Sequence, residues 1–196
     1  MLGVLVEKQR TVPDTYPLTL NALVAGCNQK SSRDPVLSLS ETDVQAALDT
    51  LKQRSLVMET SGGRVMRYGH NAERALDLPS QSIAILAALM LRGPQTAGEL
   101  RINTDRMHRF ADISAVEGFL HELATRRDGA LVVELPRTAG TRETRWAHLL
   151  GGAPTTTPPT TVEKIDETRG WQEEIDALRA ELADLRARID ALEARD

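Results

Sequence analysis

The chain has few aromatic residues, a single cysteine and no long hydrophobic run. Only two Trp, two Tyr and two Phe occur among 196 residues, so the cores must be aliphatic and no broad aromatic platform for stacking bases or sugars is expected. The lone cysteine, Cys27, excludes an internal disulfide framework and a cysteine-rich zinc site. The longest uninterrupted apolar run, residues 83–91, is too short for a membrane span, which needs about 20 residues.

Sequence motifs of the common enzyme classes are also absent. The chain contains no glycine-rich phosphate loop, no dinucleotide-binding glycine pattern and no HExxH zinc motif, and its four histidines lack metal-ligand spacing. Cys27 falls on the apolar face of a predicted helix, where a buried, inert thiol is expected. We therefore predict no enzymatic activity, no metal and no cofactor. No basic segment precedes the short apolar patch at the start, which favours a cytoplasmic protein without a membrane partner.

Charge is distributed unevenly along the chain. Lys and Arg number nine against nine Asp and Glu in residues 1–78, nine against eight in 79–152, and six against eleven in 153–196. The acidity therefore lies in the C-terminal tail. The balance of the first 152 residues neither indicates nor excludes a nucleic-acid partner, because the position of the cations decides that question.

A segment rich in Gly, Pro and Thr divides the chain. Residues 151–161 read GGAPTTTPPTT, without charge or apolar periodicity, which is typical of a linker. We predict a first domain at 1–78, a second at 79–150, this linker, and a C-terminal helix at 162–196.

The C-terminal helix carries a heptad pattern. Its a and d positions, spaced three and four apart, are Ile175, Leu178, Leu182, Leu185, Ile189 and Leu192. Ile or Leu at a with Leu at d favours two strands, and the flanking g and e residues of a parallel pair are opposite in sign. We predict a parallel coiled-coil homodimer. The alternative is a lone helix that folds back on its own domain.

Residues 1–150 predict one structural unit that occurs twice. The first unit has a short helix at its start, an extended piece at 11–17, a helix at 18–27, a third helix with a capping box of Ser40 and Asp43, and a hairpin over 56–68. The second unit has a first helix at 82–91, a second helix that begins after the cap Thr96, and a third helix that begins after Asp112. A hairpin over 131–149 follows them. Three helices followed by a hairpin are typical of a winged helix-turn-helix.

An internal offset supports this duplication. In the third helix of the first unit the apolar positions are Val44, Leu48 and Leu51. They match Val116, Leu120 and Leu123 in the third helix of the second unit, at a constant spacing of 72 residues. The predicted fold class is mainly α with small β-hairpins: two tandem winged helix-turn-helix domains plus a C-terminal coiled-coil helix.

Several stretches of this sequence resemble the YceH-like bacterial proteins. They are LNALVAGCNQKS at 20–31 with RDPV at 33–36, RGPQT at 92–96, RMH at 106–108 and RWAHLL at 145–150. The resemblance covers nearly all of residues 1–150, and its first stretch is specific. It implies two tandem winged-helix domains and brings no established activity, cofactor or functional residue.

The third helices are poor candidates for entering a DNA groove. Gln45 is placed to read an adenine, but Glu41, Asp43 and Asp49 would face phosphates. Cations lie instead on loops and hairpins, and the candidate phosphate contacts are Lys30, Arg33, Arg64, Arg67, Arg106, Arg109, Arg137, Arg142 and Arg145. Ordinary solvated arginines are the alternative explanation for this set.

Two functions follow from these observations. The first, slightly favoured, is a dimeric transcriptional regulator that contacts the backbone of double-stranded DNA through the basic hairpins and loops. The second is a protein-interaction adaptor whose winged helices bind a protein partner; the acidic third helices favour it.

The coiled coil can be tested by sedimentation. The full chain is expected to sediment as a dimer and a chain ending at Leu150 as a monomer, because only the former contains the heptads. Two monomers would contradict the homodimer.

Overall fold

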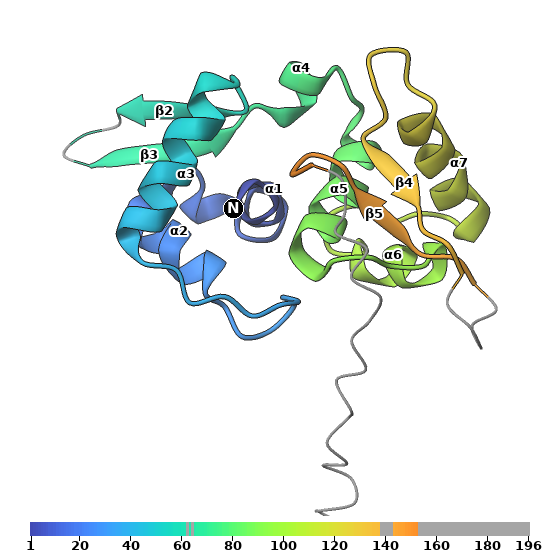
Figure 1. Cartoon of the computed structure of the whole chain (residues 1–196). Coiled ribbons are helices and arrows are strands. Elements are labelled where there is room, and N and C mark those ends of the chain that lie inside the picture. The colour runs from blue at the N-terminus through green and yellow to red at the C-terminus, as the bar shows by residue number, and fades with distance from the viewer. Residues whose placement is uncertain (62, 64, 138–142, 153–196) are drawn as a thin grey trace, which may run out of the picture. The chain divides into compact units, whose positions relative to one another are not determined.

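The described part of the chain is rich in helix and contains small antiparallel sheets (Figure 1). The computed structural model describes residues 1–61, 63, 65–137 and 143–152, which fall within a single compact unit. The predicted C-terminal helix and most of the predicted linker lie outside these residues. Within them, no helix has both the length and the apolar character that crossing a bilayer requires.

The first repeat runs from α1 to β3. Its elements are α1 (Leu2–Thr11), the 3-10 helix η1 (Pro13–Thr15), β1 (Leu18–Thr19), α2 (Leu20–Cys27), α3 (Glu41–Gln53), β2 (Val57–Ser61) and β3 (Met66–His70). The sheet order is β1-β3-β2, with Leu18 opposite Tyr68 and Val57 opposite His70. A short helix, α4 (Ala72–Leu76), leads to the second repeat.

The second repeat has the same order of three helices followed by two hairpin strands. It consists of α5 (Ser80–Arg92), α6 (Ala97–Asn103), α7 (Ile113–Ala124), β4 (Val132–Glu134) and β5 (Trp146–His148). An isolated bridge between Gln95 and Trp146 occupies the place that the β1–β3 pairing has in the first repeat. The order of three helices followed by two hairpin strands therefore occurs twice in the described residues.

The structure corrects two local predictions in the first repeat. Residues 11–17 are expected to be extended, but they contain η1. Pro13 is compatible with this short helix because the backbone N–H that proline lacks would have no partner within the helix at its first position. The second helix was expected from residue 18, but it begins at Leu20, since Leu18 and Thr19 pair with β3.

Matching side chains start the helices of the two repeats. Thr19 caps α2 and Thr96 caps α6, each by accepting a hydrogen bond from a backbone N–H of the first turn. The Ser40 hydroxyl caps α3, and the Asp43 carboxylate accepts the Ser40 N–H at 2.9 Å, which confirms the predicted capping box. Asp112 caps α7 by accepting the Ala115 N–H at 2.8 Å.

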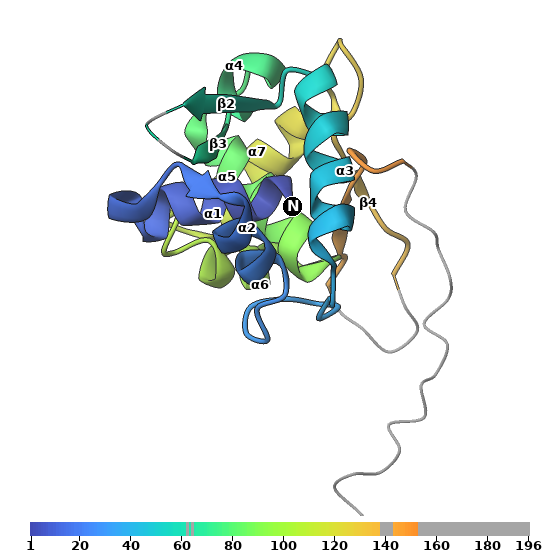
Figure 2. The same cartoon turned by 90° about the vertical axis from the view of Figure 1, so that its left-hand side faces the viewer.

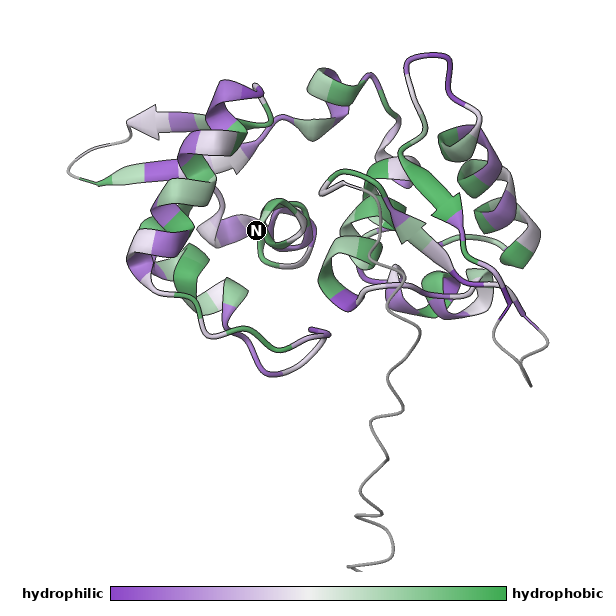
Figure 3. Ribbon diagram, in the orientation of Figure 1, coloured by the Kyte–Doolittle hydropathy of each residue, from purple (hydrophilic) through white to green (hydrophobic). Residues whose placement is uncertain are grey.

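The predicted inward faces of the third helices are confirmed. Val44 and Leu48 of α3 and Val116 and Leu120 of α7 are fully buried, and Leu51 is partly buried at the edge of the core. Hydrophobic and hydrophilic residues alternate around α3 and α7, whereas α5 is hydrophobic over most of its surface (Figure 3). Aliphatic burial on these faces holds each third helix in place.

Helices α1 and α5 pack against each other and join the two repeats (Figures 1 and 2). Leu2, Val4 and Leu5 of α1 are buried, and Ile85 and Leu89 of α5 are fully buried. A Cβ atom on Gly3 would lie 3.1 Å from the Ala87 carbonyl oxygen and 3.2 Å from Met90 Cβ. The close approach of the two helices therefore depends on the missing side chain.

Two helical glycines give a matched test of this contact. Gly3→Ala is expected to lower the free energy of unfolding by about 1–3 kcal/mol, because the methyl group would meet atoms fixed to the α5 backbone. Gly118→Ala, where nothing lies within 4 Å of an added Cβ, is expected to raise it by about 0.5–1 kcal/mol through higher helix propensity. Urea unfolding of both variants measures the difference. A gain in stability for Gly3→Ala would contradict the close contact.

Candidate functional site

The exposed face of α3 is anionic. Glu41, Asp43 and Asp49 are exposed, and the single cation of the helix, Lys52, lies 3.1 Å from Asp49 and 2.6 Å from Glu59. Hydrogen bonds from the Ser40 hydroxyl and the Ser40 backbone N–H lower the pKa of Asp43, which keeps that carboxylate charged. The face therefore presents negative charge without a free cation of its own.

Gln45, the candidate for reading a base, is half-buried on this helix. Its side-chain amide nitrogen donates to an Asp49 carboxylate oxygen at 3.1 Å. The side-chain amide group of Gln45 that would donate to an adenine is thus already hydrogen-bonded to Asp49 of the same helix.

The exposed face of α7 carries acids and borders a hollow lined by both polar and apolar residues. Asp112, Glu117 and Glu122 are exposed, and Ile113 is 47% exposed. Beside Ile113 lies a hollow of about 260 Å³ whose lining includes Ala97, Gly98, Glu117, Arg137, Glu143 and the buried Trp146. Its walls come from α6, α7 and the hairpin, so no local sequence pattern indicates it.

The structure corrects the prediction for Arg33. Its side chain is only 4% exposed, and its guanidinium donates to both Glu7 carboxylate oxygens, at 3.1 and 2.7 Å, and to the Gly26 carbonyl oxygen at 2.9 Å. The arginine therefore attaches the loop after α2 to α1 and is not a surface cation. A bidentate, buried geometry of this kind leaves little of the charge available to a phosphate.

Arg67 and Arg145 take equivalent positions in the two repeats. Arg67 donates to the Pro17 carbonyl oxygen at 2.9 Å, and Arg145 donates to the Pro94 carbonyl oxygen at 2.7 Å. Arg145 also pairs with Glu99 at 2.8 Å. Each arginine holds a hairpin strand to the segment before the second helix of its repeat, so both have a structural role.

The remaining predicted cations differ in their surroundings. Lys30, Arg106, Arg109 and Arg137 are exposed, and Arg109 lies 3.6 Å from Asp105 with 87% of its side chain accessible. Arg64 and Arg142 lie outside the described residues. So do the predicted dimerisation residues, Ile175, Leu178, Leu182, Leu185, Ile189 and Leu192.

The buried titratable groups serve the fold. A His70 ring nitrogen lies 2.6 Å from the Gln9 side-chain oxygen, the other accepts the Ala72 N–H, and burial lowers the pKa of His70. Burial also raises the pKa of the Cys27 thiol, which keeps it protonated and unreactive. In the part of the chain that the structure describes, no three His, Cys, Asp or Glu residues are grouped to hold a metal.

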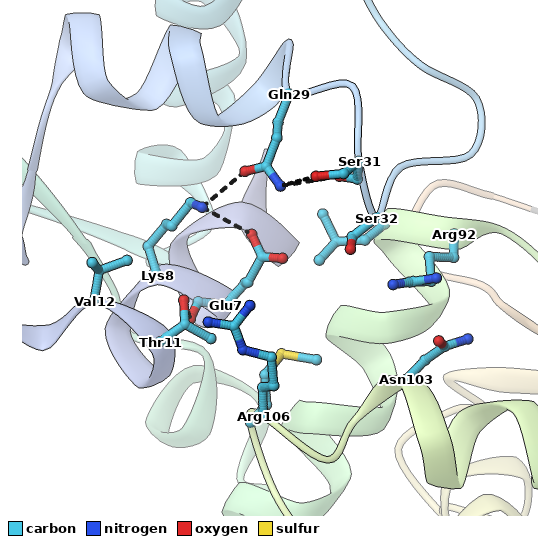
Figure 4. Close-up of a pocket in the computed structure, with 12 residues that line it drawn as sticks. Glu7, Lys8, Thr11, Val12, Gln29, Ser31, Ser32, Arg92, Asn103 and Arg106 are labelled. Carbon is cyan, nitrogen blue, oxygen red and sulfur yellow. Dashed lines mark hydrogen bonds and ion pairs between the residues drawn. The ribbon is translucent and has the colours of Figure 1, made fainter.

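A polar cavity of about 210 Å³ lies where the two repeats meet (Figure 4). Lys8 and Arg92 line it together with the predicted cation Arg106. Sequence reasoning did not select Lys8 or Arg92, because each belongs to an ordinary helix end and only the packing of α1 on α5 brings them together.

The chain is thus a helix-rich protein with small antiparallel sheets and a duplicated order of elements. It belongs to the family described as "Protein of unknown function, DUF480", which matches residues 1–141. This confirms the resemblance to an uncharacterised bacterial family.

Relatives called UPF0502 protein are similar over almost the whole chain. The one from Dechloromonas aromatica (strain RCB) is 58% identical over 194 residues, which cover 95% of this chain and 90% of the relative. The one from Acidovorax sp. (strain JS42) is 54% identical over 200 residues, covering 98% and 89% respectively. Neither name indicates an activity.

The Arg33–Glu7 pair predicts a large effect on stability. Arg33→Ala is expected to lower the free energy of unfolding by about 3 kcal/mol, because the Glu7 carboxylate, at 14% exposure, would lose its bidentate partner and keep only the Lys8 ammonium at 3.6 Å. Arg10→Ala serves as the control, since the Arg10 and Glu73 side chains are 41% and 45% exposed and such a pair contributes about 0–1 kcal/mol. Denaturant titration compares them. Equal losses would show that Arg33 is an ordinary surface residue.

Proposed function

We propose that this chain is a non-enzymatic tandem winged-helix protein that binds a protein partner through the exposed faces of α3 and α7. The order of elements supports the fold: in each repeat three helices precede a hairpin, and the segment before the second helix pairs with the hairpin. In the winged-helix arrangement, the third helix is the element that presents side chains to a ligand.

The charge of the third helices carries this proposal. A helix that enters the major groove lies between rows of phosphates, and each carboxylate there opposes binding. The exposed faces of α3 and α7 carry Glu41, Asp43, Asp49, Glu117 and Glu122, and neither helix has an exposed Lys or Arg. These faces repel DNA and suit a cationic surface.

The arginines give a second reason to favour a protein partner. Arg33, Arg67 and Arg145, three of the candidate phosphate contacts, bind carboxylates or carbonyl oxygens of their own chain. The charge of Arg33 is buried in its pair with Glu7, and some of the donors of Arg67 and Arg145 are already engaged within the fold. The set of cations that remains for a DNA backbone is smaller than the sequence indicates.

The hollow beside Ile113 suggests the chemistry of the partner. An apolar side chain would lie against Ile113, Ala97 and Trp146, while lysines or arginines around it would face Glu117 and Glu143, the two carboxylates that outnumber Arg137 in the lining. We propose that the contacting surface of the partner is an apolar anchor surrounded by positive charge. The proposed C-terminal coiled coil would pair two chains and present two such sites to the partner.

A second candidate function is contact with the backbone of double-stranded DNA. The exposure of Lys30, Arg106, Arg109 and Arg137 on loops and a hairpin favours it. These cations would supply a transcriptional regulator with salt-dependent affinity and little sequence reading.

Photo-crosslinking tests the protein partner. A photoreactive side chain at position 113 of the full chain, in cells that express it naturally, is expected to capture one discrete protein. Glu117→Lys is expected to abolish that product, because it places a cation against the partner's positive charge. The matched control is Asp14→Lys, which makes the same charge change at an exposed site in η1 and is expected to leave the product intact.

A mobility-shift assay with random duplex DNA separates the second candidate from the first. Binding that falls steeply with salt and weakens in the Arg109→Ala plus Arg137→Ala variant, with no discrete crosslinked product, would contradict the protein partner and support DNA. A crosslinked product that Glu117→Lys and Asp14→Lys leave equally intact would contradict the site on α7.

A further inference from the structure

The proposed function makes no use of the cavity where the two repeats meet. Its walls come from α1, from the loop that follows α2, from the C-terminal end of α5 and from the segment after α6 (Figure 4). Every wall carries polar side chains, among them Lys8, Gln29, Ser32, Arg92 and Arg106.

Positive charge exceeds negative charge around this cavity. Lys8, Arg92 and Arg106 are three cations, and Glu7 is the one carboxylate among the lining residues. Both oxygens of Glu7 already accept hydrogen bonds from Arg33, which forms a neutral pair with it. Lys8 lies 3.6 Å from the same carboxylate and shares it with Arg33, so Arg92 and Arg106 are the two cations that no carboxylate of the lining neutralises.

Hydrogen-bond donors around the cavity remain available. Among the residues that the structure describes, neither Arg92 nor Arg106 has a carboxylate within 4.0 Å, and the two guanidinium groups lie on either side of the cavity (Figure 4). The Lys8 ammonium donates to the Gln29 side-chain oxygen at 2.9 Å, which holds it at the wall. The Ser32 hydroxyl adds a neutral donor.

We infer that this cavity binds a small, doubly charged oxyanion of the phosphate type. A guanidinium group can donate two parallel hydrogen bonds to two oxygens of one phosphate, and an ammonium group adds a point charge. The volume of about 210 Å³ is below the roughly 300–1,000 Å³ of sites for drug-sized ligands, so the ligand must be small.

A second cavity adjoins the first and indicates how a phosphate monoester would fit. It has a volume of about 340 Å³, shares Ser32, Arg92 and Asn103 with the first cavity, and reaches Gln95 and Arg145. A phosphate group between Arg92 and Arg106 leaves this space for the substituent of the ester. The phosphate is the chemistry common to the free ion and the monoester.

Binding at this place would connect the repeats. Lys8 and Ser32 belong to the first repeat, whereas Arg92 and Arg106 belong to the second. A ligand held by both favours the arrangement in which α1 packs on α5, and it raises stability in proportion to its occupancy. This inference is independent of the proposed partner.

Calorimetric titration of the full chain with inorganic phosphate, at constant ionic strength, tests the site. Saturable binding to one site is expected, with amide NMR shifts confined to residues 7–12, 29–32, 91–92 and 103–107. Arg92→Gln combined with Arg106→Gln is expected to weaken binding at least about tenfold, because two charge-assisted hydrogen bonds are lost. A parallel titration with phosphoserine distinguishes the two ligands. A higher affinity for phosphoserine than for inorganic phosphate assigns the second cavity to the substituent of the ester, and equal affinity assigns the site to free phosphate.

The matched control removes the same charge elsewhere. Arg74→Gln combined with Arg109→Gln changes two exposed arginines outside the cavity and is expected to leave the affinity unchanged. Circular dichroism melts of both double variants verify that each is folded. The absence of saturable binding up to about 10 mM phosphate, or the same weakening in both double variants, overturns the site.

Discussion

The packing of α1 on α5 is the contact on which the arrangement of the described residues depends. Each helix is the central helix of its own repeat: α1 also contacts β3 and α2, and α5 also contacts α7 and β5. Gly3 allows the two helices to approach, and aliphatic side chains on both helices are removed from water by that approach. Because the repeats are joined through α1 and α5, α3 and α7 lie on either side of this pair (Figure 1), and their acidic side chains are exposed.

Three of the arginines predicted to contact phosphates have structural roles in the described residues. Arg67 and Arg145 make the same contact in the two repeats, from a hairpin to the carbonyl oxygen of a proline before the second helix. Arg33 joins a loop to α1 through Glu7. A positively charged hairpin is therefore not sufficient evidence for a nucleic-acid interface, since the same charge can stabilise the hairpin itself.

Local signals predicted most of the helices. Ser40, Thr96 and Asp112 start α3, α6 and α7 as expected, because a cap involves only residues within one turn of each other. The prediction missed α4 and η1, which have five and three residues and no apolar period to detect. It also missed β1, whose two residues are a strand only because β3 lies beside them.

The sequence by itself determined where the third helices begin, which of their faces point inward, that their outer faces are acidic, and that the order of three helices and a hairpin occurs twice. These properties follow from spacing and from neighbours within a few residues. Only the tertiary structure decided which cations are accessible and that Lys8, Arg92 and Arg106 share a cavity. Glu7 is 26 residues from Arg33, and Glu99 is 46 residues from Arg145. The availability of a charge depends on partners at such distances, because burial and pairing are set by packing.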